Sequence, residues 1–542
     1  MTKNNRFMPL WLAFAAIIGI VVGTFYGNHF QGNRLSIINS GSNKLSNLLY
    51  TLDDQYVDSV DMNDLVEKAI PLILAELDPH SAYLSAKDAE TANDDLRGSF
   101  FGVGIEFIIR NDTLRVQNVI GGGPAEEAGL LAGDKIVTVD DSAFTGPTLT
   151  NEVAMHTLKG PKDTQVRLGV ARYGVDSIEH FTVTRGKIET HSVTAAYMLD
   201  EKTGYVKLKN FGENTYEEML VALAQLSIDG FERLVVDLRG NTGGYLFSAV
   251  QIANEFLPRN SLIVYTEGRR SPRENHKSDG RGAYKHMPLV VLIDEGSASA
   301  SEILAGAIQD NDRGTIIGRR SFGKGLVQQP LDFADGSMMR LTIARYYTPS
   351  GRCIQKPYTS GMDREYEEDL LLRYQHGEFF SQDSIKHTGP EYHTLIKGRT
   401  VYGGGGITPD IFVPEDTTNY TSYYKEAAMS GLLLQFGYDY TDSNRQKLQE
   451  YETIDDLLKY LKRQNLVEKF VVYAEKKGLK RRNLMIQRSR HLLEEYILSR
   501  VVYTMLDEQA WQEFINREDP TVREALRVMQ EGKAFPEVES DK

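Results

Sequence analysis

The spacing of apolar residues divides this chain into segments that favour different secondary structures. Residues 34–95 carry apolar positions three and four apart, the spacing of one helical face, and predict a helical N-terminal segment. Residues 96–186 hold short apolar runs between glycine-containing turns and predict a compact β-rich unit. From 416 to 542 the helical spacing returns and predicts a helical C-terminal extension, whose last helix begins at Asp519 with Pro520 in its first turn.

Residues 187–414 alternate short apolar runs with amphipathic stretches, which is the pattern of an α/β core. The predicted strands of this core lie at 205–209, 234–238, 288–293, 315–317, 327–329 and 338–344. The predicted helices lie at 214–228, 245–256 and 298–309. Within the core, residues 353–400 are polar and aromatic without a clear period, so we expect an insertion there.

The first 30 residues predict a membrane signal-anchor. Lys3 and Arg6 precede an apolar stretch over 7–26, and about 20 apolar residues are needed to cross a bilayer. The segment 23–25 (GTF) is a poor cleavage site, so an uncleaved anchor is favoured over a cleaved signal peptide. Because basic residues stay on the cytoplasmic side, the rest of the chain is expected outside the cytoplasm.

Composition narrows the classes of partner and cofactor. A chain of 542 residues exceeds one ordinary core, so several domains are expected. The net charge of −14 argues against nucleic acid as the main partner, since phosphate binding needs a basic surface. Cys353 is the single cysteine, which excludes an internal disulfide and a thiolate metal cluster. The histidines lack metal-ligand spacing, so we expect no metal and no cofactor.

The candidate chemistry lies in the run 297–302 (SASASE), which opens an apolar helical stretch, and in Lys324 of the glycine-rich turn that follows. A serine hydroxyl is a poor nucleophile until a base removes its proton. A lysine amine can be that base if burial lowers its pKa. We therefore predict a pair of Ser299 and Lys324. In an extended segment Gln328 would lie on the same face as Lys324, where its carbonyl can orient the amine.

Backbone N–H groups can supply the oxyanion hole of such a site. Ala300 follows Ser299 at the start of the predicted helix, where the helix dipole favours developing negative charge. A second donor is expected from the glycine turn at 237–244 (DLRGNTGG), because glycine allows close approach of the backbone to a substrate. The spacing does not decide between Gly243 and Gly244.

Several longer strings resemble the C-terminal processing, or tail-specific, serine peptidases. The matching strings are 77–84 (LDPHSAYL), 237–244, 294–329, 346–352 (YYTPSGR) and 406–411 (GITPDI). The resemblance implies a crotonase/ClpP-like α/β core. It also implies that Ser299 is the nucleophile, that Lys324 is the general base and that Gln328 completes the triad. Ala300 with Gly243 or Gly244 would form the oxyanion hole.

The β-rich unit resembles the PDZ domains that are inserted in these peptidases, through the strings 101–105 (FGVGI) and 123–136 (GPAEEAGLLAGDKI). Backbone N–H groups of a glycine-containing loop can hold a carboxylate, and the adjacent strand edge can add a peptide as an extra strand. The resemblance implies that protein tails with free C-termini bind there. The residues expected to bind them are Phe101, Gly102, Val103, Gly104 and Ile105.

These features together predict a serine endopeptidase that is anchored in the inner (cytoplasmic) membrane and cleaves near the C-termini of cell-envelope proteins on the periplasmic side. The C-terminal helices offer a surface for homo-oligomer formation. One alternative is a non-catalytic PDZ scaffold that binds protein tails. A second is a phosphate-binding P-loop at 318–325, but Gly325 stands where the motif needs serine or threonine.

Overall fold

The computed structural model describes residues 41–172, 174–361, 366–387 and 389–535. The predicted anchor in residues 1–30 lies outside them. Within these described ranges, no helix is both long enough and apolar enough to span a bilayer. The chain forms two compact units, the first ending at Glu76 and the second beginning at Leu77.

The first unit contains helix α2 (Gly41–Gln55) and helix α3 (Met62–Ala75). Asp61 caps α3 by accepting hydrogen bonds from the N–H groups of Asn63 and Asp64. The rest of the predicted N-terminal segment belongs to the second unit. It forms strand β1 (Ala82–Leu84), which pairs with a strand of the core, and helix α4 (Ala86–Arg97).

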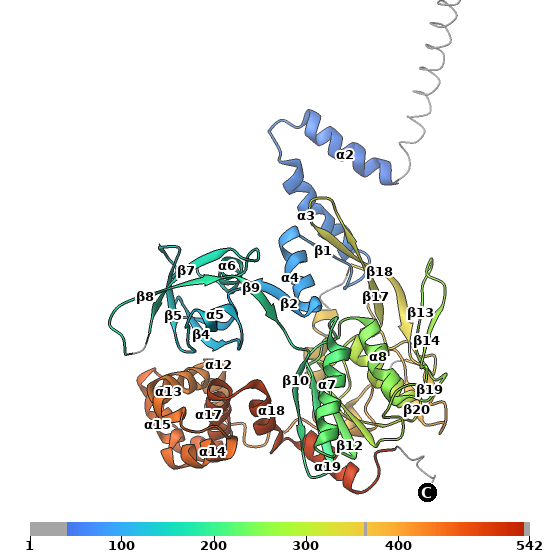
Figure 1. Cartoon of the computed structure of the whole chain (residues 1–542). Helices are drawn as coiled ribbons and strands as arrows, with labels where there is room; N and C mark the ends of the chain where they lie inside the picture. Colours follow the sequence, from blue (N-terminus) through green and yellow to red (C-terminus); the bar gives the residue numbers. More distant parts are fainter. Residues whose placement is uncertain (1–40, 173, 362–365, 388, 536–542) are drawn as a thin grey trace, which may run out of the picture. The chain divides into compact units, whose positions relative to one another are not determined.

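The β-rich unit is an antiparallel sheet with strand order β3-β4-β5-β7-β8. Its strands are β3 (Ile105–Arg110), β4 (Thr113–Val119), β5 (Lys135–Val139), β7 (Gln165–Ala171) and β8 (Glu179–Thr184), with the short β6 (Ser142–Ala143) beside β5. Its helices are α5 (Pro124–Glu127) and α6 (Asn151–Leu158). The chain enters and leaves through a ribbon of β2 (Ser99–Gly102) and β9 (Gly186–Glu189) (Figure 1). Strand β3 lies at the edge of the sheet, so its outer side is open to another strand.

A six-stranded sheet forms the α/β core, in the order β10-β11-β12-β15-β16-β21. These strands are β10 (Val193–Met198), β11 (Thr203–Leu208), β12 (Arg233–Asp237), β15 (Leu289–Ile293), β16 (Thr315–Gly318) and β21 (Ile411–Phe412). Only the β10–β11 pair is antiparallel among them. The central strands are continuous apolar runs, as expected for a sheet that is buried on both faces.

Helices cover both faces of this sheet. Helices α7 (Thr215–Ile228), α8 (Leu246–Phe256) and α9 (Ala300–Asp310) share a buried cluster with one set of alternating strand residues, among them Val236 and Val291. The other set, with Val235 and Val290, packs against α19 (Pro520–Gln530). Asp519 caps α19 and Pro520 is its first residue, as the sequence predicted. The predicted C-terminal extension therefore ends in a helix that belongs to the core.

A second sheet lies beside the core, in the order β1-β18-β13-β14, with β17 also paired to β18. Its strands β17 (Leu326–Asp332) and β18 (Met338–Tyr347) were expected, whereas β13 (Leu262–Glu267) and β14 (Glu274–Lys277) were not. The segment predicted as an insertion contains α11 (Asp369–Gln375), the 3-10 turn η1 (Gln382–Ser384), β19 (Glu391–His393) and β20 (Thr400–Tyr402).

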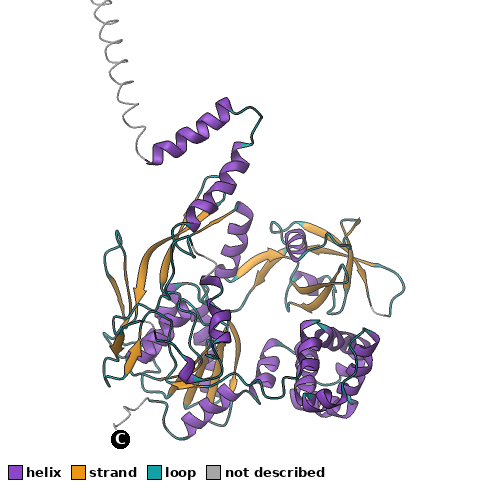
Figure 2. Cartoon of the chain, turned by 180° about the vertical axis from the view of Figure 1, so that it is seen from behind, coloured by secondary structure: helices purple, strands orange, loops and turns teal. Residues whose placement is uncertain are grey.

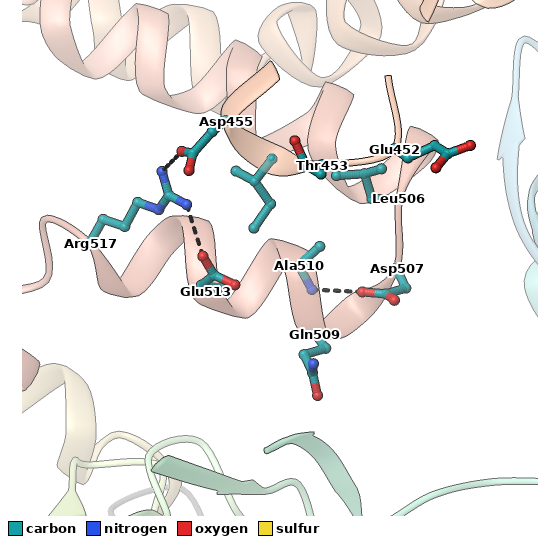
Figure 3. A pocket seen from close by; sticks show the side chains of 10 residues that line it. Glu452, Thr453, Asp455, Leu506, Asp507, Gln509, Ala510, Glu513 and Arg517 are labelled. Carbon is teal, nitrogen blue, oxygen red and sulfur yellow. Dashed lines mark hydrogen bonds and ion pairs between the residues drawn. The ribbon is translucent and has the colours of Figure 1, made fainter. Parts of the chain in front are cut away.

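The extension before α19 is a group of helices (Figure 2). These helices bury their own apolar cluster. The helices are α12 (Ser422–Met429), α13 (Leu432–Leu448), α14 (Ile454–Leu461), η2 (Lys462–Gln464), α15 (Leu466–Lys476), α16 (Asn483–Arg488), α17 (Arg490–Met505) and α18 (Glu508–Asn516). A pocket of about 350 Å³ lies between the start of α14, the end of α17 and α18. At the side of this pocket, Arg517 forms ion pairs with Asp455 at 2.6 Å and with Glu513 at 2.8 Å (Figure 3).

Candidate active site

Three neighbouring parallel strands of the core bring the candidate residues together. The turn at 238–244 follows β12, the serine run follows β15, and the segment with Lys324 follows β16. The carboxyl ends of parallel strands lie at one edge of a sheet, which is where α/β proteins place their ligand sites. Ser299, Lys324, Gln328, Gly243 and Gly244 line one cleft of about 1050 Å³ there.

The three serines of the run have different surroundings. The hydroxyl of Ser297 donates a hydrogen bond to the carbonyl of Leu238 at 2.8 Å, and that of Ser301 to the carbonyl of Asn241 at 2.8 Å. Both bonds tie the run to the turn after β12, and both serines are fully buried. Ser299 is the one serine of the run that lines the cleft.

Ser299 has a backbone conformation that residues with a side chain rarely adopt, with φ at 58° and ψ at −114°. Helix α9 begins at the next residue, Ala300, so the serine lies at the positive end of the helix dipole. Gly243 packs against this turn. A Cβ atom on Gly243 would lie 2.7 Å from Ser299 Cβ and 2.9 Å from Ala300 N, so only glycine fits there.

The N–H groups near Ser299 differ in their hydrogen bonds. The N–H of Gly243 donates to Asn241 Oδ1 at 2.9 Å. Among the residues that the structure describes, the N–H groups of Gly244 and Ala300 have no acceptor. Gly244 has φ at 146°, and a Cβ atom on it would lie 2.1 Å from the carbonyl oxygen of Phe211.

Lys324 and Gln328 contact each other. Lys324 Nζ donates a hydrogen bond to Gln328 Oε1 at 3.3 Å. Gln328 lies on β17, and its Nε2 donates to the carbonyl oxygen of His80, which fixes the amide with its oxygen toward the lysine. The strand β17 begins two residues after Lys324, whereas a P-loop would continue into a helix.

Burial is the main cause that lowers the pKa of Lys324, and the positive charge of Arg340 lowers it further. The carboxylates of Glu302 and Asp78 act in the opposite direction. The net effect is a lowered pKa, so the neutral amine is more populated at a given pH than in a free lysine.

Glu302 connects the segment that carries Ser299 to the segment that carries Lys324. Its Oε2 accepts hydrogen bonds from the N–H groups of Ser299 and Lys324, both at 2.8 Å. Its Oε1 accepts from the N–H of Gly323 at 2.7 Å and from the hydroxyl of Ser321 at 2.5 Å. Burial raises the pKa of this carboxyl to about 7, although its four donors favour the ionised form. The sequence interpretation gave Glu302 no role, although a glutamate three residues after a serine at a helix start is a capping-box signal.

The loop before β1 supports Gln328 from the other side. Asp78 accepts hydrogen bonds from the N–H groups of His80 and Ser81, both at 2.9 Å, and from the hydroxyl of Thr342 on β18 at 3.0 Å. This holds the His80 carbonyl in place. Burial lowers the pKa of the His80 ring to about 4, so the ring is neutral at pH 7. The string 77–84 does not by itself predict this contribution.

A second pocket, of about 380 Å³, lies between the edge strand β3 and helix α6 of the β-rich unit. Val103, Gly104 and Ile105 line it, and their binding of a tail stays a prediction. Phe101 and Gly102 are not among its lining residues in the described structure; Phe101 is 43% exposed, and the neighbouring Phe100 lines the pocket instead. In the described ranges no group of three histidine, cysteine or carboxylate residues could hold a metal ion.

Comparison with known proteins matches three segments to families. Residues 202–366 match peptidase family S41, residues 102–183 match the PDZ domain and residues 423–507 match a family of unknown function (DUF8443). A carboxy-terminal-processing protease of Bartonella bacilliformis is 39% identical over 307 residues, 56% of this chain and 69% of the relative. A carboxyl-terminal-processing protease of Synechocystis sp. is 38% identical over 296 residues, 53% of this chain and 68% of the relative.

Among solved structures, the photosystem II D1 C-terminal processing protease is 29% identical, covering 67% of this chain and 86% of its own, with a TM-score of 0.36. The sequence matches carry the assignment, because the relative from Bartonella bacilliformis is aligned over more than two thirds of its length. The chain therefore belongs to the carboxy-terminal-processing proteases of peptidase family S41, and it is a serine-type peptidase with a PDZ domain.

Proposed function

We propose that this chain is an endopeptidase that cleaves proteins near their C-termini by a Ser-Lys mechanism. The observation that carries the proposal is the buried lysine of lowered pKa, held by Gln328 in the same cleft as a strained serine. The names of the relatives support the choice of C-terminal tails as substrates.

In this mechanism the neutral amine of Lys324 takes the proton of the Ser299 hydroxyl as the oxygen attacks a peptide carbonyl. The ammonium that forms stays hydrogen-bonded to Gln328. It returns the proton to the leaving amine when the C–N bond breaks, which leaves an acyl-enzyme. Water then attacks the ester, Lys324 again accepting a proton, and Ser299 is restored when that proton returns to its oxygen.

For the oxyanion hole we propose Gly244 and Ala300. Ala300 follows Ser299, Gly244 lines the same cleft, and neither N–H group has an acceptor among the described residues, whereas the N–H of Gly243 is bonded to Asn241. Gly243 then acts by its missing side chain, because any Cβ atom would collide with the nucleophile. Two preorganised N–H donors stabilise the tetrahedral intermediate better than its precursor.

The PDZ domain is proposed to capture the substrate tail. The free edge of β3 can pair with an extended peptide, and the apolar pocket beside α6 can take its last side chain. Gly104, with φ at 82°, lies where the terminal carboxylate would meet backbone N–H groups. Self-association through the C-terminal helices stays a prediction.

The first prediction concerns the nucleophile and the base. Ser299→Ala and Lys324→Ala are each expected to reduce peptide hydrolysis by roughly 10⁴-fold or more, and the double variant to be no worse than either, because the two act as one unit. The matched control is Ser301→Ala, which removes one buried hydrogen bond but leaves Ser299 in place. Steady-state assays measure this, and substantial hydrolysis by Ser299→Ala contradicts the assignment.

The second prediction concerns pH. In the parent, kcat/KM should rise with pH as two groups lose protons, Glu302 near pH 7 and Lys324 below its ordinary 10.5. Glu302→Gln should lower kcat roughly ten- to hundredfold, because an amide offers N–H where two N–H donors need an acceptor.

The same variant should lose the ionisation of Glu302 and move that of Lys324 to lower pH, because a carboxylate that raises the lysine pKa is gone. Glu295→Gln is the control; Glu295 pairs with Arg319 and does not line the cleft. An unchanged profile in Glu302→Gln would refute this role.

The third prediction concerns the tail. Met155 on α6 lines the PDZ pocket and is 38% exposed, so Met155→Asp should fold and repel a terminal carboxylate. We expect kcat/KM for free-tailed proteins to fall about tenfold, and amidation of the tail to cause a similar loss in the parent. Val153→Asp, on the same helix at 44% exposure and away from the pocket, is the control. Equal cleavage of free and amidated tails would rule out carboxylate recognition.

The fourth prediction concerns location. We propose that residues 1–30 anchor the peptidase in the inner membrane with its catalytic part in the periplasm, on the support of the apolar stretch over 7–26 after Lys3 and Arg6. A chain that lacks residues 1–30 should stay active and appear in the soluble fraction, while the parent is recovered with membranes. Recovery of the intact parent from the cytosol would overturn the proposal.

A further inference from the structure

The arginine Arg340 of the second unit has unusual surroundings. Several partly buried arginines of the core have carboxylate partners, as in Arg239 with Asp237 at 2.7 Å and Arg320 with Glu378 at 2.6 Å, and the buried Arg313 donates to backbone carbonyls. Arg340 is likewise only partly exposed. Within the described ranges its guanidinium takes part in no hydrogen bond and no ion pair. A guanidinium without a partner in a half-buried position is a site for an anion.

The position of Arg340 places it in the catalytic cleft. It lies on β18, in register with Ala82 on β1 and Pro330 on β17. It lines the cleft together with Ser299 and Gln328. Lys324 lines the same cleft, and the positive charge of Arg340 is among the causes that lower its pKa.

The charge of the cleft is opposite to the charge of the chain. The charged residues among its lining residues are Lys209, Lys324, Arg340 and one carboxylate, Glu213. The chain as a whole has a net charge of −14. Since Lys324 must be neutral to act as base, Arg340 is a permanent positive charge of the cleft that acts on the base.

We propose that Arg340 binds a side-chain carboxylate of the substrate, so that this peptidase prefers an aspartate or glutamate close to the scissile bond. The inference rests on the proposed peptidase function and adds a specificity determinant to it. A guanidinium can hold a carboxylate through two parallel N–H donors, which gives direction as well as affinity. The tail carboxylate is a second source of the same chemistry, and the experiment separates the two.

Carboxylate binding at Arg340 has a consequence for the base. The charged and titratable groups that act on Lys324 are Glu302 from α9, Asp78 and His80 from the loop before β1, and Arg340 from β18. A carboxylate on Arg340 cancels part of its field, so the pKa of Lys324 rises in the complex. The ionisation seen in kcat should therefore lie at higher pH for an acidic substrate than for its neutral counterpart.

The experiment uses a short peptide that the parent cleaves, with the scissile bond located by mass spectrometry. Glutamate and glutamine are exchanged at each position near that bond, with the tail free and with the tail amidated. We expect one position at which the glutamate peptide has a kcat/KM roughly tenfold above that of the glutamine peptide, with free and amidated tails alike. Arg340→Gln should bring that ratio close to one, and Arg340→Glu should invert it.

Arg345→Gln is the matched control, because Arg345 lies on the same strand, is exposed and does not line the cleft. It should keep the parent ratio. Hydrolysis of the glutamine peptide by Arg340→Gln shows that the variant folds and that the proposed peptidase function stands, whatever the ratio does.

Three results would overturn the inference: equal cleavage of the two peptides by the parent at every position, an unchanged ratio in Arg340→Gln, or a preference that disappears when the tail is amidated. The last result would assign the guanidinium to the chain end. Failure to find any peptide that the parent cleaves would instead contradict the proposed function.

Discussion

The carboxylate of Glu302 is the contact on which the rest of this active site depends. A nucleophile at a helix start and a base in a separate loop have no covalent reason to stay aligned. Glu302 supplies one, because one of its oxygens accepts from the N–H of Ser299 and from the N–H of Lys324. Burying a carboxylate costs free energy, and four donors from the protein offset that cost. The strained φ of Ser299 persists inside this frame.

The second sheet supplies the remaining side chains around Lys324. Lys324 comes from the carboxyl edge of the parallel sheet, whereas Gln328 and Arg340 come from antiparallel strands. The amine thus lies between a layer that fixes its backbone and a layer that sets its electrostatic surroundings.

Much of the core could be predicted from the sequence because its strands are buried on both faces. The runs at 234–238 and 288–293 are continuous in apolar residues and correspond to β12 and β15. Strands β10, β13 and β14 were missed. The helical spacing of residues 416–542 did not predict that α19 packs on the core, because the pattern of an amphipathic helix does not indicate which surface it covers.

In the candidate site too, the sequence indicates single residues but not the contacts between distant segments. Ser299 and Lys324 are recognisable by residue type and flanking glycines, and Gln328 by its spacing. The roles of Glu302, His80 and Arg340 depend on contacts between segments far apart in the chain. The two glycines of the turn cannot be told apart by their sequence pattern. They differ in the structure, where the N–H of Gly243 donates to Asn241 and the two residues pack against different neighbours.

The helices that pack on the two faces of the core sheet come from different parts of the chain, and this affects how the protein can fold. One face is covered by helices that alternate with the strands, so their contacts are local. The other face is covered by α19, which follows the whole helical extension. These contacts have a high contact order, and forming them means closing a long loop. Without α19, the apolar side chains that it covers, among them Val235 and Val290, would be open to solvent, so any state in which α19 is undocked is exposed to aggregation and to other proteases.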